Sequence, residues 1–130
     1  MTRTFCVGGT PVGELGDVFE VVAAAQAAGT AMLGPGVVAG EVDKACRDRI
    51  AQAGWADLFE HGTGHGVGLD IHEGPAVGAG STAILQPGTV VTVEPGVYLP
   101  GTGGVRIEDT LVVTEHGSRS LTQFPKEVAV

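Results

Sequence analysis

Two helices are predicted in the first half of the chain, because apolar residues recur there at intervals of three and four. The first runs from Glu14 to Leu33 and is stopped by Gly34-Pro35-Gly36, and the second runs from about Glu41 to Ala53, with Gly54 just past its end. The expected inner positions are Leu15, Val18, Phe19 and Val22 of the first helix and Val42, Ala45, Cys46, Arg49, Ile50 and Ala53 of the second.

The second half of the chain carries the turn residues and apolar runs that are typical of β-strands. Strands are expected at residues 89–94 and 105–114 with a short one at 119–123, and one more precedes the first helix at 2–7. Proline and glycine separate the later strands. Helices followed by antiparallel strands give an α+β fold, and a single domain over residues 1–130 fits the length of the chain.

Composition argues against two classes of partner. Lys and Arg total 7 against 15 Asp and Glu, which gives a net charge of −8 and disfavours binding to nucleic acid or to an anionic membrane. No apolar run approaches the roughly 20 residues of a membrane span, and the first residues lack the apolar region of a signal peptide. Cys6 and Cys46 sit in apolar patterns and are expected to be buried free thiols in a reducing compartment, so the cytoplasm is the expected location.

Three of the four histidines lie in one glycine-rich stretch, HGTGHGVGLDIHEGP, at residues 61–75. Glycine packs no side chain and loses entropy when it is ordered, so this stretch is not expected to form a core strand. Instead, His61, His65 and His72 are expected to lie close to a ligand that needs room. Neutral imidazole binds metal ions and carries protons near neutral pH, which suits either role.

Two glutamates are placed symmetrically about a Pro/Gly turn. Glu94 stands seven residues before Gly101 and Glu108 stands seven residues after it. If the flanking segments pair as an antiparallel ribbon, the two carboxylates come nearly opposite each other, which is unfavourable unless positive charge lies between them. Arg106 shares a face with Glu108 and could supply part of that charge, and a divalent cation would supply more. Carboxylates with histidine suit Mn, Co, Fe or Zn, and bridging carboxylates suggest a two-metal site.

Each of these residues also has a simpler interpretation. A single histidine is most often a surface residue or a satisfied core residue, the two glutamates could be solvated strand ends, and Arg106 could be an ordinary ion-pair partner. Asp70 and Glu73 are expected to form local hydrogen bonds or to lie at the surface. The hypothesis of a shared site therefore depends on the joint pattern.

Three blocks of the sequence, HGTGHGVGLDIHEGP, TVVTVEPGVY and GGVRIEDTLVVT, resemble in order and spacing the motifs of the proline-specific "pita-bread" metallopeptidases, Xaa-Pro dipeptidase (prolidase) and aminopeptidase P. The resemblance covers essentially the whole chain. It implies a pita-bread fold, truncated at its N-terminal side, with an antiparallel sheet and helices packed on one face. Methionine aminopeptidases share GHGxG and a later HE, but usually lack a histidine at the position of His61 and an RIED block.

The resemblance also implies roles for individual residues. The positions that match metal ligands are His65, Glu94 and Glu108. Glu108 would bridge two ions, and Glu94 would also take the proton of the attacking water. His61 and His72 match histidines that contact the substrate and stabilise the tetrahedral intermediate. Arg106 matches an arginine that supports the site by pairing with a carboxylate.

The activity that the resemblance implies is hydrolysis of the Xaa-Pro bond in dipeptides or short peptides by an enzyme with two divalent ions, and homodimers are common in the family. The family has five metal ligands, and the first two are aspartates. The second aspartate usually stands just before a segment like MTRTF, which is residues 1–5 here, and no aspartate precedes Asp17. We therefore expect part of a catalytic domain that is inactive alone and holds no ion or one ion.

Three alternatives stay open at this point. The chain could be a non-catalytic binding or interaction domain on the same fold, a methionine aminopeptidase-like peptidase, or a metal-independent hydrolase such as creatinase. Both glutamates are present, whereas the creatinase branch typically loses metal-ligand carboxylates. The sequence does not separate dipeptidase from aminopeptidase P, and it does not identify the metal.

Overall fold

The computed structural model describes residues 1–11 and 13–129. Two helices, α1 (Glu14–Met32) and α2 (Ala39–Gln52), are followed by a 3-10 turn, η1 (Ala56–Leu58), and then by strands. The strands are β1 (Gly64–Gly66), β2 (Glu73–Val77), β3 (Val90–Val93), β4 (Gly96–Leu99), β5 (Gly103–Arg106), β6 (Asp109–Thr114) and β7 (Gly117–Ser120). Of the helices in these residues, none combines the length and the apolar character that crossing a membrane requires.

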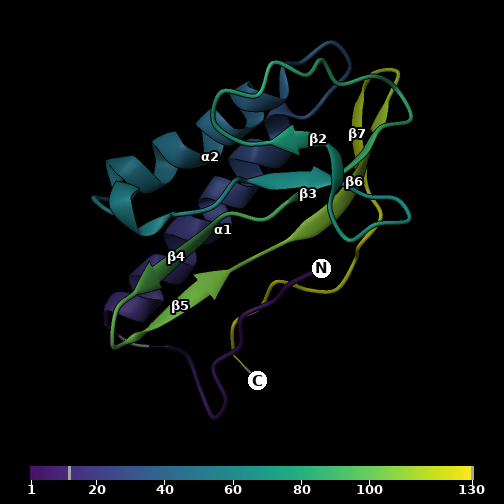
Figure 1. The fold of residues 1–130 in the computed structure, drawn as a ribbon. Coiled ribbons are helices and arrows are strands. Elements are labelled where there is room, and N and C mark those ends of the chain that lie inside the picture. The colour runs from purple at the N-terminus through teal and green to yellow at the C-terminus, as the bar shows by residue number, and fades with distance from the viewer. Residues whose placement is uncertain (12, 130) are drawn as a thin grey trace.

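The strands form one antiparallel sheet with the order β2-β1-β3-β6-β7, and β4 and β5 form a separate antiparallel ribbon. The ribbon extends β3 and β6 in the same register, because Val93 pairs with Asp109 and Gly96 pairs with Arg106. Figure 1 shows α1 and α2 stacked on one face of the strands. The expected α+β fold with helices on one face is confirmed.

The helices bury most of the positions that their periodicity predicts. In α1, Val18, Phe19 and Val22 are buried against the sheet, and in α2 the buried apolar positions are Ala39, Val42, Cys46 and Ile50. The prediction was wrong for Arg49 and Ala53, which are exposed, and it missed Asp43, which is buried. The charged head of Arg49 remains in water, whereas Asp43 finds hydrogen-bond partners inside the protein.

The predicted strands differ from the observed ones at their ends. Residues 2–7 form only isolated bridges, Thr2 with Glu108 and Cys6 with Ala129. The predicted strand at 89–94 ends at Val93, shortly before Pro95, which has no N–H to donate. The predicted strand at 105–114 is divided into β5 and β6 by residues 107 and 108. The final strand, β7, begins two residues earlier than expected.

The glycine-rich stretch contains a strand, β1, which the sequence did not predict. A side chain on Gly64 would overlap with the carbonyl oxygen of Thr92, and one on Gly66 would overlap with that of Gly74. Three backbones therefore pass close together here, and only glycine allows it. The space that a side chain would need at these two positions is filled by β3 and β2.

A buried ion cluster joins the two ends of the described chain to β6. Asp109 is 4% exposed, and its carboxylate contacts Arg3 at 2.7 Å and Lys126 at 2.6 Å. Gln26 and Thr122 also donate to it. Burial alone would raise the pKa of Asp109, but hydrogen bonds from Lys126, Arg3 and Thr122 outweigh this effect and hold the pKa below its usual value.

The two cysteines are free, as expected, but only Cys46 is fully buried. Its thiol donates to the carbonyl oxygen of Ala25, so it packs at the contact between α1 and α2. Burial raises the pKa of the Cys46 thiol to about 12. Cys6 lies partly exposed in the N-terminal segment.

We predict that the native protein exposes one reactive thiol. Cys6 should react with a thiol reagent at pH 8, whereas Cys46 should react only after unfolding, because thiolate is the reactive form and burial disfavours it. Titration with a chromogenic disulfide, with and without denaturant, measures both rates, and Cys6→Ser serves as the control. Rapid native labelling of Cys46 in the Cys6→Ser variant would contradict the predicted burial.

Candidate functional site

The candidate site lies on the face of the sheet that is turned away from the helices. Side chains alternate along a strand, so Thr92 and Glu94 point to one side while the apolar side chains between them point to the helices. Across the register, Glu108 just before β6 and Thr110 within β6 point to the same side, and Arg106 joins them from the end of β5. All five line one pocket.

The two glutamates occupy opposed positions of the antiparallel register. Paired residues on either side, Val93 with Asp109 and Gly96 with Arg106, are equidistant from Gly101, and this places Glu94 against Glu108. The symmetric arrangement that was inferred from the sequence is therefore present. The backbone N–H of Glu94 donates to the carbonyl of Thr63 at 2.7 Å, and the carboxylate of Glu108 accepts from the hydroxyl of Thr2.

His65 is held so that one ring nitrogen faces Glu94. Its Nδ1 lies 2.8 Å from the carbonyl oxygen of Gly66, which can only accept, so Nδ1 carries the proton. Its backbone N–H donates to Oγ1 of Thr92, and Nε2 lies 3.3 Å from Oε1 of Glu94. A lone pair on Nε2 facing a carboxylate is favourable only with a proton or a metal ion between them.

This arrangement fits a divalent cation. A histidine that donates Nδ1–H to a backbone carbonyl presents Nε2 as a ligand atom with a fixed orientation. Thr92 also donates to Oε1 of Glu94 at 3.0 Å, which orients the carboxylate in the same way. Among residues 1–11 and 13–129, however, no group of three His, Cys, Asp or Glu side chains already stands close enough together to hold an ion.

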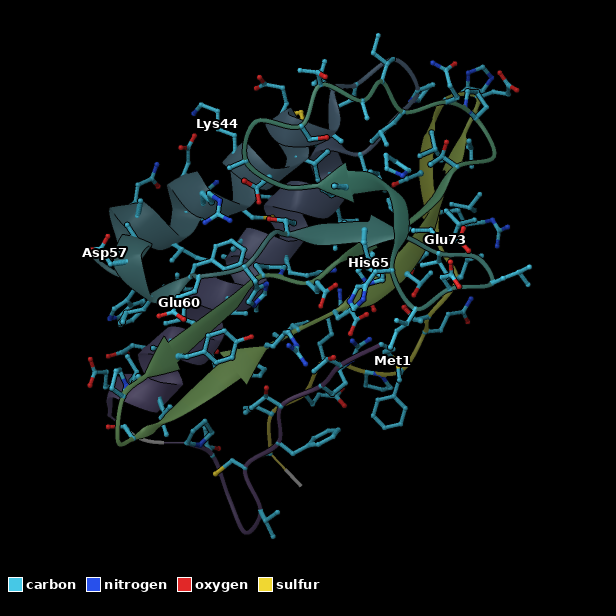
Figure 2. All side chains as sticks on the ribbon, in the orientation of Figure 1. Met1, Lys44, Asp57, Glu60, His65 and Glu73 are labelled. Carbon is cyan, nitrogen blue, oxygen red and sulfur yellow. The ribbon has the colours of Figure 1, made fainter. Side chains whose placement is uncertain are left out.

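The other two histidines, His72 and His61, line the pockets beside His65. His72 packs edge-to-face on His65, with 4.5 Å between ring centroids, and its exposed ring lies at the mouth of the pocket. A second pocket, lined by His61, adjoins the first and shares with it His65, His72, Glu94 and Arg106. The structure thus brings together all six residues that the sequence proposed. His65 and Met1, both labelled in Figure 2, line the first pocket.

Both ring nitrogens of His61 are already engaged. Nδ1 lies 2.8 Å from the carbonyl oxygen of Gly62, and Nε2 lies 2.7 Å from the hydroxyl of Tyr98. Arg106 donates from Nη1 to the same hydroxyl at 3.4 Å. Hydrogen bonds therefore link Arg106, Tyr98 and His61 in a row.

Tyr98 was not identified from the sequence, although a signal was available. The register that opposes Glu94 and Glu108 also places Tyr98 opposite Gly104, on the same face as Arg106. A side chain at Gly104 would come within 2.6 Å of the Tyr98 ring, and one at Gly96 would come within 2.6 Å of its hydroxyl. The two glycines therefore leave the space that the phenol occupies.

Arg106 forms no ion pair among the described residues, although the resemblance implied one with a carboxylate. Its Nε is buried and has no hydrogen-bond partner there. Because buried donors are nearly always paired, this N–H is available to a group that enters the pocket. Asp70 and Glu73 form the expected local hydrogen bond, from the N–H of Asp70 to Glu73 at 2.8 Å.

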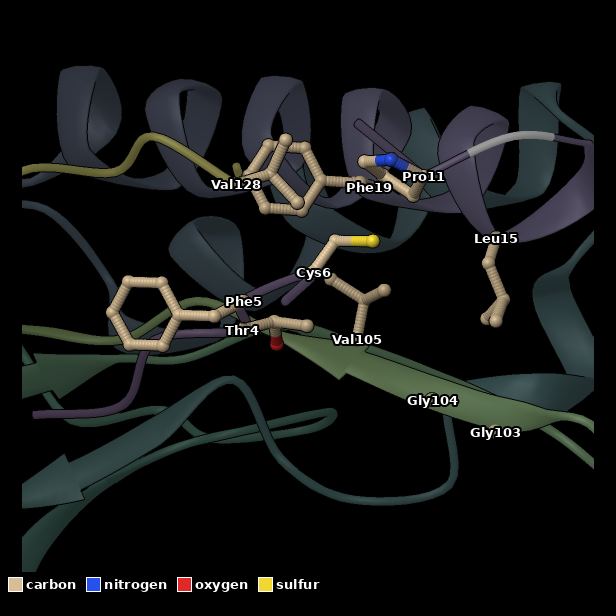
Figure 3. A pocket seen from close by; sticks show the side chains of 10 residues that line it. All are labelled: Thr4, Phe5, Cys6, Pro11, Leu15, Phe19, Gly103, Gly104, Val105 and Val128. Atoms are coloured by element: carbon tan, nitrogen blue, oxygen red, sulfur yellow. The ribbon is translucent and has the colours of Figure 1, made fainter. Parts of the chain in front are cut away.

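A separate pocket lies between the N-terminal segment, α1 and β5 (Figure 3). It shares no residue with the two pockets above. Its lining is apolar apart from Thr4 and the thiol of Cys6, so it lacks the carboxylates and imidazoles of the candidate site.

The chain is similar to known proteins along its whole length. The sequence pattern of one family, described as metallopeptidase family M24, matches residues 1–115. An uncharacterized peptidase of Bacillus subtilis, YqhT, is 51% identical over 130 residues, which are 100% of this chain and 36% of that protein.

Two solved structures are similar along nearly the whole chain. The prolidase from Pyrococcus horikoshii has a TM-score of 0.94 and 42% identity and covers 97% of this chain, and the X-Pro aminopeptidase from Thermotoga maritima has a TM-score of 0.93 and 36% identity and covers 98%. In both cases the match spans 36% of the solved chain, so this chain corresponds to about a third of the length of its relatives.

We predict that β1 tolerates no side chain at Gly64. Gly64→Ala should lower the free energy of unfolding by at least about 3 kcal/mol, because the new methyl group would displace Thr92 and with it His65. Gly78→Ala is the matched control, since the nearest atom to its new Cβ would be 3.6 Å away. Urea denaturation of both variants measures the difference, and equal stability would contradict the close packing of β1 on β3.

Proposed function

Because the chain belongs to metallopeptidase family M24, we propose that the protein is a dinuclear metallopeptidase that cleaves the peptide bond before proline in dipeptides or short peptides. Its fold is the pita-bread fold. Residues 1–130 would be part of the catalytic domain. The similarity to a prolidase and to an X-Pro aminopeptidase supports proline specificity. The choice between these two activities depends on how the C-terminal end of the substrate is bound.

The observation that carries this proposal is the position of three donor groups. Glu94 and Glu108 are opposed across the register, and Nε2 of His65 faces Glu94 at 3.3 Å. Two carboxylates and one imidazole acceptor directed at the same space repel one another unless a cation lies among them. The proposed ligands are therefore His65, Glu94 and Glu108.

The bound ions would polarise the scissile carbonyl and make water a nucleophile at neutral pH. Manganese is our first choice, and Co, Zn and Fe suit the same donors. Three donors are enough for one ion, as in many catalytic zinc sites, so we expect residues 1–130 alone to hold no ion or one. The cytoplasm is the proposed location, and a homodimer is the proposed assembly.

The remaining side chains would handle protons and hold the substrate. Glu94, at the centre of the site, would accept the proton of the attacking water. His72 at the mouth of the pocket would contact the substrate and stabilise the oxyanion of the tetrahedral intermediate. His61 would do so from the adjoining pocket, after exchanging its bond to Tyr98 for one to the substrate. Arg106 would support the site with its free Nε.

We predict that Glu94→Gln lowers kcat by at least about 100-fold in the metal-loaded, full-length protein, because the amide can neither accept the proton nor supply the ligand charge. Steady-state hydrolysis of an Xaa-Pro dipeptide gives kcat. Glu115→Gln, at an exposed position in the turn between β6 and β7, is the control and should behave as the unmodified protein does. Unchanged turnover in Glu94→Gln would exclude the proposed role.

We also predict that hydrolysis requires a divalent metal and a proline after the scissile bond. Dialysis against a chelator should abolish hydrolysis, and separate additions of Mn, Co, Zn and Fe should restore it to different extents. Matched peptides with alanine in place of proline measure the specificity. Full activity in the metal-stripped protein, or equal rates on the two peptides, would contradict the proposal.

A further inference from the structure

Two charged residues of α2 bind the segment that leads into β1. Asp43 and Arg47 are one helical turn apart, and Nε of Arg47 donates to Oδ2 of Asp43 at 2.7 Å. The two remaining nitrogens of the guanidinium donate to backbone carbonyls, Nη1 to Phe59 at 3.0 Å and Nη2 to His61 at 2.5 Å. The guanidinium also lies 4.3 Å from the centre of the Phe59 ring.

The second oxygen of Asp43 binds the next part of the same segment. Oδ1 accepts from the backbone N–H of Thr63 at 3.0 Å and from its hydroxyl at 2.8 Å. Both side chains are almost completely buried, with 1% exposure for Asp43 and 0% for Thr63. The carbonyl of Thr63 in turn accepts from the N–H of Glu94. One hydrogen-bonded path therefore runs from Asp43 to the backbone of Glu94.

The same pair also determines where the His61 ring stands. Arg47 fixes the carbonyls of residues 59 and 61, and the Phe59 ring packs edge-to-face on the His61 ring with 5.0 Å between centroids. The opposite edge of His61 is bound to Tyr98. The imidazole is thus held between a ring positioned by α2 and a hydroxyl positioned by β4.

We propose that Asp43 and Arg47 are positioning residues for His61 and Glu94, an inference that rests on the proposed function of those two side chains. Neither Asp43 nor Arg47 lines the two pockets of the site. They act through backbone groups, and the planar guanidinium suits this task because it directs three separate donors at fixed angles. A lysine could reach only one of the carbonyls. Groups that orient active-site residues in this way typically contribute about 10–100-fold to activity.

The test is a double-mutant cycle in the metal-loaded, full-length protein. Arg47→Met should lower kcat/KM for an Xaa-Pro dipeptide by about 10–100-fold. If the loss arises through His61, it should largely disappear when His61 is already replaced. The fold-loss of kcat/KM caused by Arg47→Met should therefore be at least about tenfold smaller in a His61→Asn background than in the unmodified protein. Lys44→Met is the matched control, since Lys44 forms an exposed ion pair with Asp48 on the same helix, and it should leave kcat/KM unchanged.

A spectroscopic measurement separates positioning from general stability. In the zinc-loaded protein, the nuclear Overhauser contact between the rings of His61 and Tyr98 should be lost in Arg47→Met and kept in Lys44→Met. If Arg47→Met does not fold, Arg47→Lys replaces it, because lysine can keep the bond to Asp43, and a smaller loss is then expected. Both measurements are made below the unfolding temperature of each variant.

The outcomes distinguish this inference from the proposed function. Coupled losses of kcat/KM and a lost ring contact support positioning. Independent, additive losses, or an unchanged ring contact in the Arg47 variants, overturn it. If His61→Asn and Glu94→Gln both leave hydrolysis intact, the proposed function is wrong, and the ring contact alone still decides whether Arg47 positions His61.

Discussion

One antiparallel register, centred on Gly101, runs through both the ribbon and the main sheet, and the candidate site depends on it. The register continues across the two interruptions, so Glu94 and Glu108 stay opposed although neither belongs to a strand. Both carboxylates therefore line one pocket on the side of the sheet away from the helices. A cation bound there would offset the repulsion between like charges on opposed positions. The hydrogen bonds of His65 and Thr92 then direct further donors to the same place.

The sequence predicted those parts of the structure that follow from the intervals between residues along the chain. The position of Gly101 was enough to oppose the glutamates, and periodicity was enough to find α1 and most of α2. β1 was missed because a strand of glycine and one histidine has no apolar alternation, and its place is set by the backbones of β2 and β3. Asp43 and Arg47 were missed because their partners are backbone groups of another segment, which no pattern within a helix reveals.

Two adjacent carboxylates at the start of β6, Glu108 just before it and Asp109 as its first residue, have different partners. Glu108 points to the pocket, whereas its neighbour Asp109 points to the helices and gathers Arg3, Lys126 and Gln26. Arg3 also donates to the carbonyl of Glu108, so the buried cluster fixes the backbone from which the exposed carboxylate projects. The carboxylate of Asp109 is enclosed by Arg3 and Lys126, whereas that of Glu108 lines the pocket, where it accepts from the hydroxyl of Thr2 and lies 3.4 Å from the amine of Met1.

The hydrogen bonds of Asp43 and Arg47 to the segment before β1 also determine where residues can be inserted into this fold. An additional residue between them would rotate Arg47 by about 100° around the helix axis and carry it away from the carbonyls that it binds. Insertions in this turn of α2 should therefore be rare among related proteins. The exposed turn at Glu115 and His116, between β6 and β7, lines neither pocket, so added residues there would leave the site undisturbed. Length variation in the family should accordingly concentrate in such loops, while the four-residue interval from Asp43 to Arg47 stays constant.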